Sequence, residues 1–451
     1  MKKILVLSSL FLTTFFLQLM GAEIQPLDEL QITEKRFATV EARTDHGKFS
    51  YHLDNSGKRD VSAALQEIFT RLQSLEDTSV SLTFLPGVYF IDQPIDIKLV
   101  SLEMRGTGHG GLDVHGMNLK SGTIFRFGKN TGPNCLTFHR ARHQRSFPAG
   151  ETPWKFQNSK VSLEGLTFMG HNNTGVDTAA GYSRMRGDEP NFRGLHWFPA
   201  KDRYQDPEKE GQRALVFPAG WKNELLRVNN CFFTELYVGI DADHCDVCYL
   251  TDNWFAQLAY GIRIKGSSPV AMIKNNCFAD LETAVILGNA RASNLNGNGF
   301  AYVSKCFQID SIFDSTISHN TVTNWKKSTG AAAFGAFCYV ANSENLVISG
   351  NAIRQELDSR TRTRTIDEKP NGRSFITIEN SKNLLFSQNI VHTIQTQTVV
   401  RLHNVTNSLI TDNLITFGEG GNAVAQTGNS SANLYRPSNP AQSAHFDEFK
   451  N

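Results

Sequence analysis

An asparagine that recurs about once per twenty-odd residues constrains the fold of this 451-residue chain more than any other feature. It stands in a short pattern: an aliphatic residue, two variable residues, Asn, any residue, then an apolar residue, as in Leu250-Thr-Asp-Asn-Trp-Phe255. The pattern recurs with its asparagine at Asn230, Asn253, Asn276, Asn298, Asn320, Asn351, Asn389 and Asn413. A repeat of this length with strand-like alternation is typical of stacked coils. The sequence therefore predicts an all-β fold, a single-stranded right-handed parallel β-helix.

The asparagine itself has a structural explanation. Equivalent residues of stacked coils lie about 4.8 Å apart, so one inward Asn per coil can hydrogen-bond to the copies above and below it. The aliphatic and Phe positions around it are expected to stack into the core. We therefore expect the asparagines to be scaffold residues.

The N-terminus has the composition of a signal peptide, predicted at residues 1–22. Met1-Lys-Lys3 is basic, the run from Ile4 to Met20 is apolar, and Gly21-Ala22 supplies small residues for cleavage. An uncleaved anchor helix is the alternative, because the run approaches membrane-spanning length. The expected location is secreted or periplasmic, with no membrane association after cleavage.

The rest of the chain divides into three predicted parts, the second of which carries an insertion. Residues 23–59 form an N-terminal extension, 60–423 the β-helix, 171–215 a long loop inserted in it, and 424–451 a polar C-terminal tail. Residues 60–75 predict an amphipathic helix with Asp60 as its N-cap and an apolar face of Val61, Ala64, Leu65, Ile68, Phe69, Leu72 and Leu75. Such a helix is suited to close the exposed first coil of a solenoid.

The charge and the cysteines of the chain argue against a nucleic-acid partner and against a metal site. Lysine and arginine (45) nearly cancel aspartate and glutamate (44), so no net charge favours nucleic acid as a partner. The seven cysteines are an odd number, and most stand beside apolar residues, as small core residues do. Cys245 and Cys248 have metal-binding spacing but lack a second Cys or His pair, so no metal site is predicted.

Comparison of equivalent positions in successive coils identifies one region for chemistry. Asp252 precedes a repeat asparagine, and Trp254, which follows it, is the large aromatic residue of its column. About ten residues after each asparagine lies a second strand, in which Asp241, Arg263, Ile286 and Gln308 should stack. An acid, a base and an aromatic group on one face are typical of carbohydrate sites. The candidate residues are Asp241, Asp252 and Arg263 for catalysis, and Trp254, Lys265, Lys274 and Glu282 for substrate binding.

Four of the candidates also have a purely structural interpretation. Asp412 occupies the same repeat position as Asp252, so an aspartate there can be a simple neighbour of the ladder. Trp254 can pack under a loop. An exposed ion pair between Asp241 and Arg263 would contribute little to stability.

Two segments carry a family resemblance: Phe84-Leu-Pro-Gly-Val-Tyr89 and Leu102-Glu-Met-Arg-Gly-Thr-Gly-His-Gly110. Together with the coils from Arg227 to about Ile353, they resemble the inulin fructotransferases of glycoside hydrolase family 91. The resemblance implies a pectate-lyase-like β-helix, an exported enzyme that cleaves a fructan or related polysaccharide by glycosyl transfer or hydrolysis, and a homotrimer. It implies no cofactor.

The resemblance places the family's catalytic Asp on Asp252 and its catalytic Glu on Arg263. The second position departs from the family, because cleavage needs a group that protonates the leaving oxygen and arginine keeps its proton near neutral pH. Asp241 and Glu282 are the alternative acids. A rival hypothesis is a polysaccharide lyase, with Arg263, Lys265 or Lys274 as base and Ca²⁺ held by carboxylates such as Asp241 and Asp243. A third is a glycan-binding β-helix without catalysis.

Overall fold

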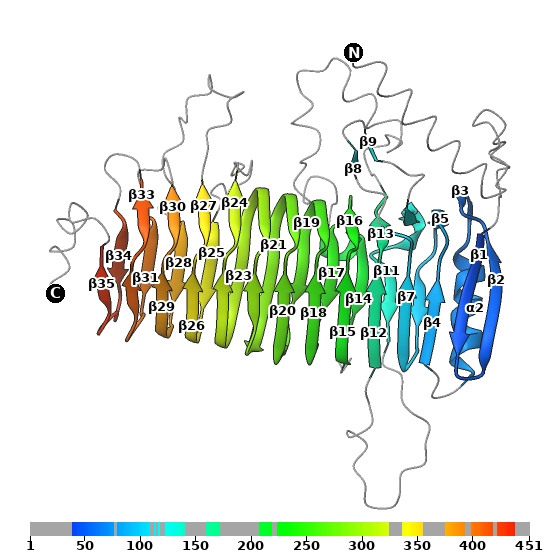
Figure 1. Cartoon of the computed structure of the whole chain (residues 1–451), viewed down its shortest axis with the longest axis horizontal. Coiled ribbons are helices and arrows are strands. Elements are labelled where there is room, and N and C mark those ends of the chain that lie inside the picture. Colours follow the sequence, from blue (N-terminus) through cyan, green and yellow to red (C-terminus); the bar gives the residue numbers. More distant parts are fainter. Residues whose placement is uncertain are drawn as a thin grey trace, which may run out of the picture. The chain divides into compact units, whose positions relative to one another are not determined.

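The computed structural model describes residues 38–75, 79–108, 112–113, 116–117, 122–139, 159–171, 207–218, 223–323, 336–354, 375–392, 398–417 and 422–437. They belong to one compact unit and form a right-handed parallel β-helix, as predicted (Figure 1). The predicted signal peptide at 1–22 and most of the inserted loop at 171–215 lie outside the described residues.

Each coil contributes a strand to three parallel sheets. Sheet 1 contains β4 (Ser79–Thr83), β7 (Ser101–Arg105), β12 (Ser159–Glu164), β15 (Asn223–Asn229), β18 (Val247–Thr251), β20 (Val270–Lys274), β22 (Asn294–Asn296), β26 (Glu344–Ser349), β29 (Lys382–Ser387), β32 (Leu409–Thr411) and β35 (Leu434–Arg436). Sheet 2 contains β3 (Ser56–Asp60), β5 (Gly87–Ile91), β10 (Thr123–Phe127), β13 (Leu166–Met169), β16 (Phe232–Thr234), β24 (Thr321–Thr323), β27 (Ala352–Arg354), β30 (Ile390–His392) and β33 (Leu414–Thr416). Sheet 3 contains β6 (Ile95–Ile97), β11 (Asn134–Phe138), β14 (Arg213–Phe217), β17 (Val238–Ala242), β25 (Ala336–Ala341), β28 (Ile376–Glu379), β31 (Val400–His403) and β34 (Val424–Thr427).

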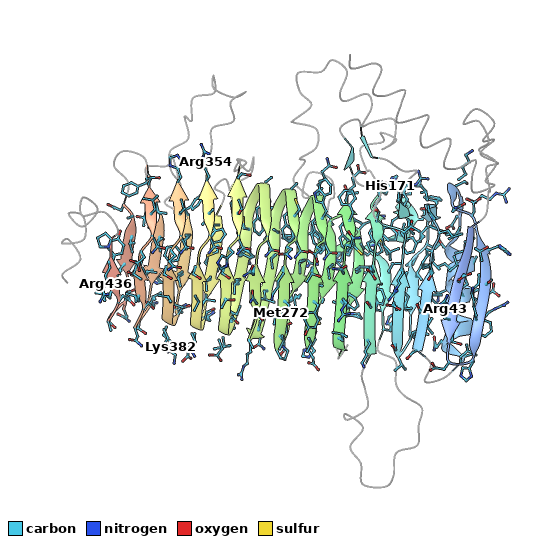
Figure 2. All side chains as sticks on the ribbon, viewed as in Figure 1. Arg43, His171, Met272, Arg354, Lys382 and Arg436 are labelled. Carbon is cyan, nitrogen blue, oxygen red and sulfur yellow. The ribbon has the colours of Figure 1, made fainter. Side chains whose placement is uncertain are left out.

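Three long strands continue from one sheet into the next. These are β19 (Trp254–Ile264), β21 (Cys277–Arg291) and β23 (Gly299–Ser318), which run from sheet 2 into sheet 3, with β23 reaching sheet 1 of the following coil. In the view of Figure 2, Met272 of sheet 1 and Arg354 of sheet 2 lie at opposite sides of the coils. The remaining short elements are a hairpin of β8 (Leu112–Asp113) and β9 (Gly116–Met117), a 3-10 turn η2 (Lys129–Thr131) and α6 (Pro207–Glu210).

A ladder of buried asparagines joins the coils at the corner between sheets 1 and 2. The Oδ1 atom of Asn276 accepts hydrogen bonds from the backbone N–H and the Nδ2 of Asn253, both at 3.0 Å. The Nδ2 of Asn276 in turn donates to the Leu250 carbonyl at 2.8 Å and to Asn298 at 3.0 Å. The same pattern continues to Asn413, and the ladder side chains are at most 4% exposed. The predicted structural role is confirmed.

The first of the eight predicted ladder positions is wrong by one residue. The backbone N–H of Cys231, not of Asn230, donates to Asn253 Oδ1 at 3.0 Å, so Cys231 occupies the ladder position. Asn230 has φ +50° and is equivalent to Asp252. The left-handed backbone at this corner favours Asn, Asp and Gly over other residues.

Stacked phenylalanines fill the interior beside the ladder. Phe233, Phe255, Phe278 and Phe300 stack with ring centroids 4.8, 5.0 and 5.1 Å apart and planes within 10° of parallel. All four are buried. The aromatic column follows the same coil spacing as the asparagines, as expected.

The N-terminal end of the solenoid is closed by different means at each sheet. Helix α2 (Ser62–Gln73) buries Leu65, Ile68, Phe69 and Leu72. Its Gln66 side chain donates to the Asp96 carbonyl at 2.9 Å and accepts from the Asp96 N–H at 2.8 Å, which satisfies the open edge of β6 in sheet 3. Sheet 2 begins with β3, and sheet 1 is covered by antiparallel β1 (Ala38–Thr44), which pairs with β2 (Gly47–Leu53).

The helix and the terminal strands begin and end at other residues than the sequence predicted. The helix starts at Ser62 rather than at Asp60, although Asp60 Oδ1 accepts the Ser62 N–H at 2.9 Å, and Ala64 is exposed. Strands β1–β3 lie within the residues that we expected to form an extension. At the other end β34 and β35 continue sheets 3 and 1 past residue 423, because their alternate apolar residues still pack on the last coil.

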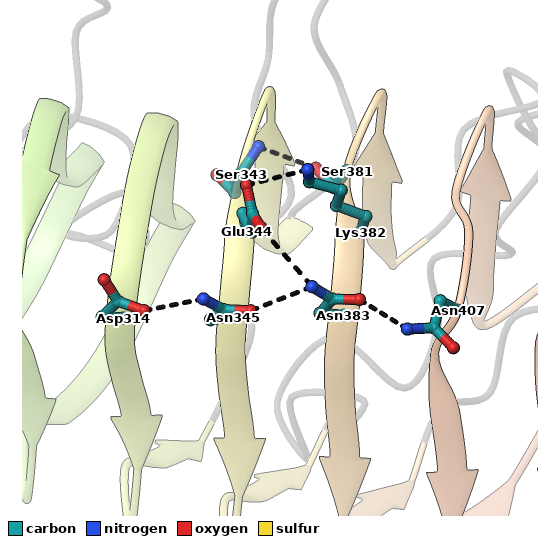
Figure 3. A network of polar contacts seen from close by, with 8 residues as sticks. All are labelled: Asp314, Ser343, Glu344, Asn345, Ser381, Lys382, Asn383 and Asn407. Carbon is teal, nitrogen blue, oxygen red and sulfur yellow. Dashed lines mark hydrogen bonds and ion pairs between the residues drawn. The ribbon is translucent and has the colours of Figure 1, made fainter.

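A second asparagine column lies on the outside, at the corner before sheet 1 (Figure 3). Asn345 donates to Asp314 at 2.7 Å, Asn383 to Asn345 at 3.0 Å, and Asn407 to Asn383 at 2.6 Å. All four residues have φ between +50° and +57°. Asparagine thus serves both a buried and a solvent-facing corner.

All seven cysteines are free thiols, and six of them are buried. Burial raises the pKa of the Cys135, Cys231 and Cys338 thiols to about 12. They are small core residues, as the sequence indicated. Cys277 is the exposed member of the set.

We expect Asn298→Ala to lower the free energy of unfolding by about 3 kcal/mol, because two donors of Asn276 and the Ile273 carbonyl lose their buried partner. Chemical denaturation of the purified protein measures the change. Asn296→Ala, two residues away in a part-buried position, is the matched control and should cost less than about 1 kcal/mol. Equal losses in the two variants would contradict a stabilising ladder.

Iodoacetamide should modify Cys277 in the native protein and leave the six buried cysteines intact, because the reagent can reach the exposed thiol and the packed interior excludes it from the others. Peptide mass spectrometry before and after denaturation identifies the modified sites. Rapid native modification of Cys135 or Cys338 would show that the core opens.

Candidate functional site

Asp241 and Arg263 form a bidentate ion pair on the outer face of sheet 3. Parallel pairing of β17 with β19 sets the two residues side by side. Arg263 donates from Nε to Asp241 Oδ1 at 2.8 Å and from Nη2 to Oδ2 at 2.6 Å. The predicted column of Asp241, Arg263, Ile286 and Gln308 is confirmed by the strand registers.

The pair is more buried than an ordinary surface ion pair. Arg263 is 2% exposed, and its guanidinium lies 5.5 Å from the ring centroid of Tyr260 and 5.8 Å from that of Tyr237. Arg213 of β14 reaches Asp241 from the preceding coil, with Nε 3.3 Å from Oδ2. A second guanidinium and two aromatic faces offset the cost of removing these charges from water.

Arg213, Tyr237 and Tyr260 were not among the candidates derived from the sequence. Arg213 falls inside the expected insertion at 171–215, where no repeat alignment was available. The tyrosines do not occupy equivalent positions, because the register partner of Tyr260 is Val238. Their rings nevertheless contact each other across successive coils, with centroids 5.3 Å apart.

Asp252 lies elsewhere, at the exposed corner between sheets 1 and 2. It has φ +59°, and its Oδ2 accepts a hydrogen bond from Asn229 Nδ2 at 3.1 Å. The equivalent residues of the other coils also have positive φ: Asn230, Asn275, Gly297, His319, Gly350, Gln388 and Asp412. The corner backbone therefore accounts for an Asp or Asn at this position without any catalytic role.

Trp254 is half-buried and begins β19 directly after that corner. Its neighbour in the preceding coil is Phe232, with ring centroids 5.2 Å apart, because the true register is shifted by one residue. The expectation that Trp254 is the one large aromatic of its column is therefore wrong. The tryptophan has an aromatic packing partner on the preceding rung.

The remaining candidates lie either near Asp252, at the corner between sheets 1 and 2, or further along the chain toward sheet 3. Lys274 is half-buried at the end of β20, where its register partner is Thr251, next to Asp252. Lys265 is exposed directly after β19, close in sequence to Arg263, and Glu282 is half-buried within β21. The structure thus brings Asp241 and Arg263 together but separates them from Asp252 and Trp254 by the length of β19, which turns at Gln257 with φ +61°.

No group of three or more His, Cys, Asp or Glu side chains in the described part of the chain is arranged to hold a metal ion. In the same residues, no helix has the length and apolar character needed to cross a membrane.

Comparison with known proteins gives a match in fold. A family model described as periplasmic copper-binding protein (NosD) matches residues 204–334. No curated protein matches the sequence. The structure is similar to that of DFA-IIIase from Arthrobacter chlorophenolicus A6.

A cysteine-to-alanine mutant of DFA-IIIase in complex with DFA-III has a TM-score of 0.59 and 12% identity, covering 85% of this chain and 92% of that one. The same enzyme without its lid has a TM-score of 0.59 and 13% identity with the same coverage. Its complex with GF2 has a TM-score of 0.56 and 12% identity, covering 83% and 90%. At this identity the likeness establishes the parallel β-helix fold, which the sequence predicted.

We expect Asp252→Asn to leave the free energy of unfolding within about 0.5 kcal/mol of the natural protein, because Asn tolerates the left-handed corner. Asp252→Val is the contrasting variant and should cost about 1–2 kcal/mol, since a β-branched residue is strained at this φ. Denaturation curves of both variants measure this. A large loss in Asp252→Asn would show that its carboxylate contributes to the fold.

Proposed function

We propose that this chain is an exported carbohydrate-active enzyme of the inulin fructotransferase type, which cleaves a fructan or a related polysaccharide by glycosyl transfer or hydrolysis. The observation that carries the proposal is the Arg213–Asp241–Arg263 group on the outer face of sheet 3. The fold likeness to DFA-IIIase and the motifs around Phe84 and Leu102 support it.

We assign to Asp241 the stabilisation of the positive charge that develops on the sugar ring in the transition state. Cleavage of a glycosidic bond passes through an oxocarbenium-like transition state, which a carboxylate on one face of the sugar can stabilise or attack. The two guanidinium groups hold this carboxylate in one orientation, as a preorganised site requires. Its side chain keeps 15% exposure, so it stays open to a substrate.

Arg263 has a positioning role in this proposal. Both its Nε and its Nη2 donate to Asp241, and a guanidinium holds its protons near neutral pH, so it is neither the acid of a hydrolase nor the base of a lyase. Glu282, two rungs along the axis from Asp241, is the proposed source of the proton for the leaving oxygen, since Asp252 lies beyond the far end of β19. Trp254, Lys265 and Lys274 are proposed to contact the sugars around these carboxylates.

Incubation of the purified mature protein with inulin, levan, pectate and alginate tests the reaction class. We expect fructose, fructo-oligosaccharides or a difructose dianhydride from inulin or levan, measured by anion-exchange chromatography. An unsaturated uronate product, measured by its absorbance, would contradict the proposal in favour of a lyase. Binding without turnover on every polymer would favour a non-catalytic glycan-binding protein.

Asp241→Asn should lower kcat on the active polymer by at least about a hundredfold, because the carboxylate charge that stabilises the transition state is removed. Asp243→Asn, two residues along the same coil at an exposed position, is the matched control and should retain kcat within about twofold. Melting temperatures of both variants separate catalysis from folding. Similar kcat in both variants would place the reaction elsewhere.

A further inference from the structure

A second group of polar side chains lies further along the outer face of sheet 3. Tyr339 of β25 is in the same column as Asp241 and Arg263, four rungs beyond Asp241. In the adjacent column the strand registers align Asp310, Ala341 and Glu379 on successive rungs. The rung spacing places Tyr339 roughly 19 Å from Asp241 along the solenoid axis.

Tyr339 is hydrogen-bonded to one of the two carboxylates. Its Oη donates to Glu379 Oε2 at 2.9 Å. Burial, together with the hydrogen bond to Glu379 and the charges of Glu379 and Asp310, raises the pKa of Tyr339. The phenol therefore stays protonated and held against Glu379, with its ring half-buried in the face of the sheet.

The carboxylates differ from Asp241 in their partners. Asp310 Oδ1 accepts from Asn342 Nδ2 at 2.8 Å and from Ser311 Oγ at 3.2 Å. These partners, like Tyr339, are neutral, and neither Asp310 nor Glu379 has an ion pair with a described residue. The two carboxylates therefore lie one rung before and one rung after Tyr339, and among the described side chains no cation is paired with either of them.

This chemistry suits a neutral sugar. Carboxylate oxygens accept hydrogen bonds from sugar hydroxyls, and such charge-assisted bonds are stronger than neutral ones. An aromatic side chain offers an apolar face to the ring carbons. A uronate polymer would bring further negative charge to Asp310 and Glu379 and would be disfavoured there, while the cationic Arg401 lies in the Tyr339 column on the rung beyond Glu379.

We propose that Asp310, Tyr339 and Glu379 form a distal subsite that binds a neutral oligosaccharide chain running along the solenoid axis from Asp241. The inference rests on the proposed function and specifies its substrate as an uncharged glycan several units long. The shared column supplies the track, since equivalent positions repeat at every coil between the two places.

Titration calorimetry with the full mature protein tests the subsite, using short and long inulin oligosaccharides and oligogalacturonides of matched length. The natural protein should bind the long fructan more tightly than the short one and more tightly than the galacturonides. Glu379→Gln should weaken binding of the long fructan by roughly tenfold and reduce its advantage over the short one, because a charge-assisted bond is lost. Tyr339→Phe, which removes only the hydroxyl, should reduce the same advantage.

Glu344→Gln is the matched control, because Glu344 lies on sheet 1, where it pairs with Lys382 at 3.1 Å (Figure 3). It should keep the chain-length advantage of the natural protein. Equal losses for short and long chains in Glu379→Gln, or tighter binding of galacturonides, would overturn the subsite. Length-dependent fructan binding without turnover would support the subsite and contradict the proposed reaction, so the two ideas fail separately.

Discussion

The side-chain amide of the ladder asparagine is the interaction on which the coil geometry depends. Each amide joins three coils, because its Oδ1 accepts from the coil before while its Nδ2 donates to a carbonyl of that coil and to the next Asn. Buried amides are costly when unpaired. Only coils that repeat at one spacing satisfy all of them, and that spacing also stacks the phenylalanines and sets the registers of the outer columns.

This regularity explains why much of the fold could be predicted from the sequence. The stacking of Asp241 with Arg263 followed from counting along coils of similar length, and the register bears it out. The same counting went wrong at Val228-Asn-Asn-Cys-Phe-Phe233, where it aligned Asn230 with the ladder. Val228 and Phe233 have the same spacing around Cys231 as Leu250 and Phe255 have around Asn253, so the apolar residues marked the register and the asparagine did not.

The ends of the solenoid and the site were harder to predict for a related reason. A terminal coil packs against another coil on one side only, so fewer of its residues must be apolar. Strands β2 and β34 are accordingly polar. Their sequences therefore resemble those of a linker or a tail. Arg213 comes from a coil whose preceding residues do not follow the repeat. Its contact with Asp241 depends on pairing of β14 with β17, which is a property of the assembled sheet and not of the local sequence.

The outer face of sheet 3 separates two kinds of carboxylate, and this separation bears on mechanism. Asp241 is enclosed by guanidinium groups, whereas Asp310 and Glu379 have neutral partners. A carboxylate fixed by two cations can meet positive charge in a transition state, but its environment provides no proton for a leaving group. The proposed reaction therefore needs an acid from another coil on the same side, and a substrate held along the axis would bring its reacting bond to that acid. In a solenoid, unlike a compact barrel, the distance between such groups is set by the number of coils between them.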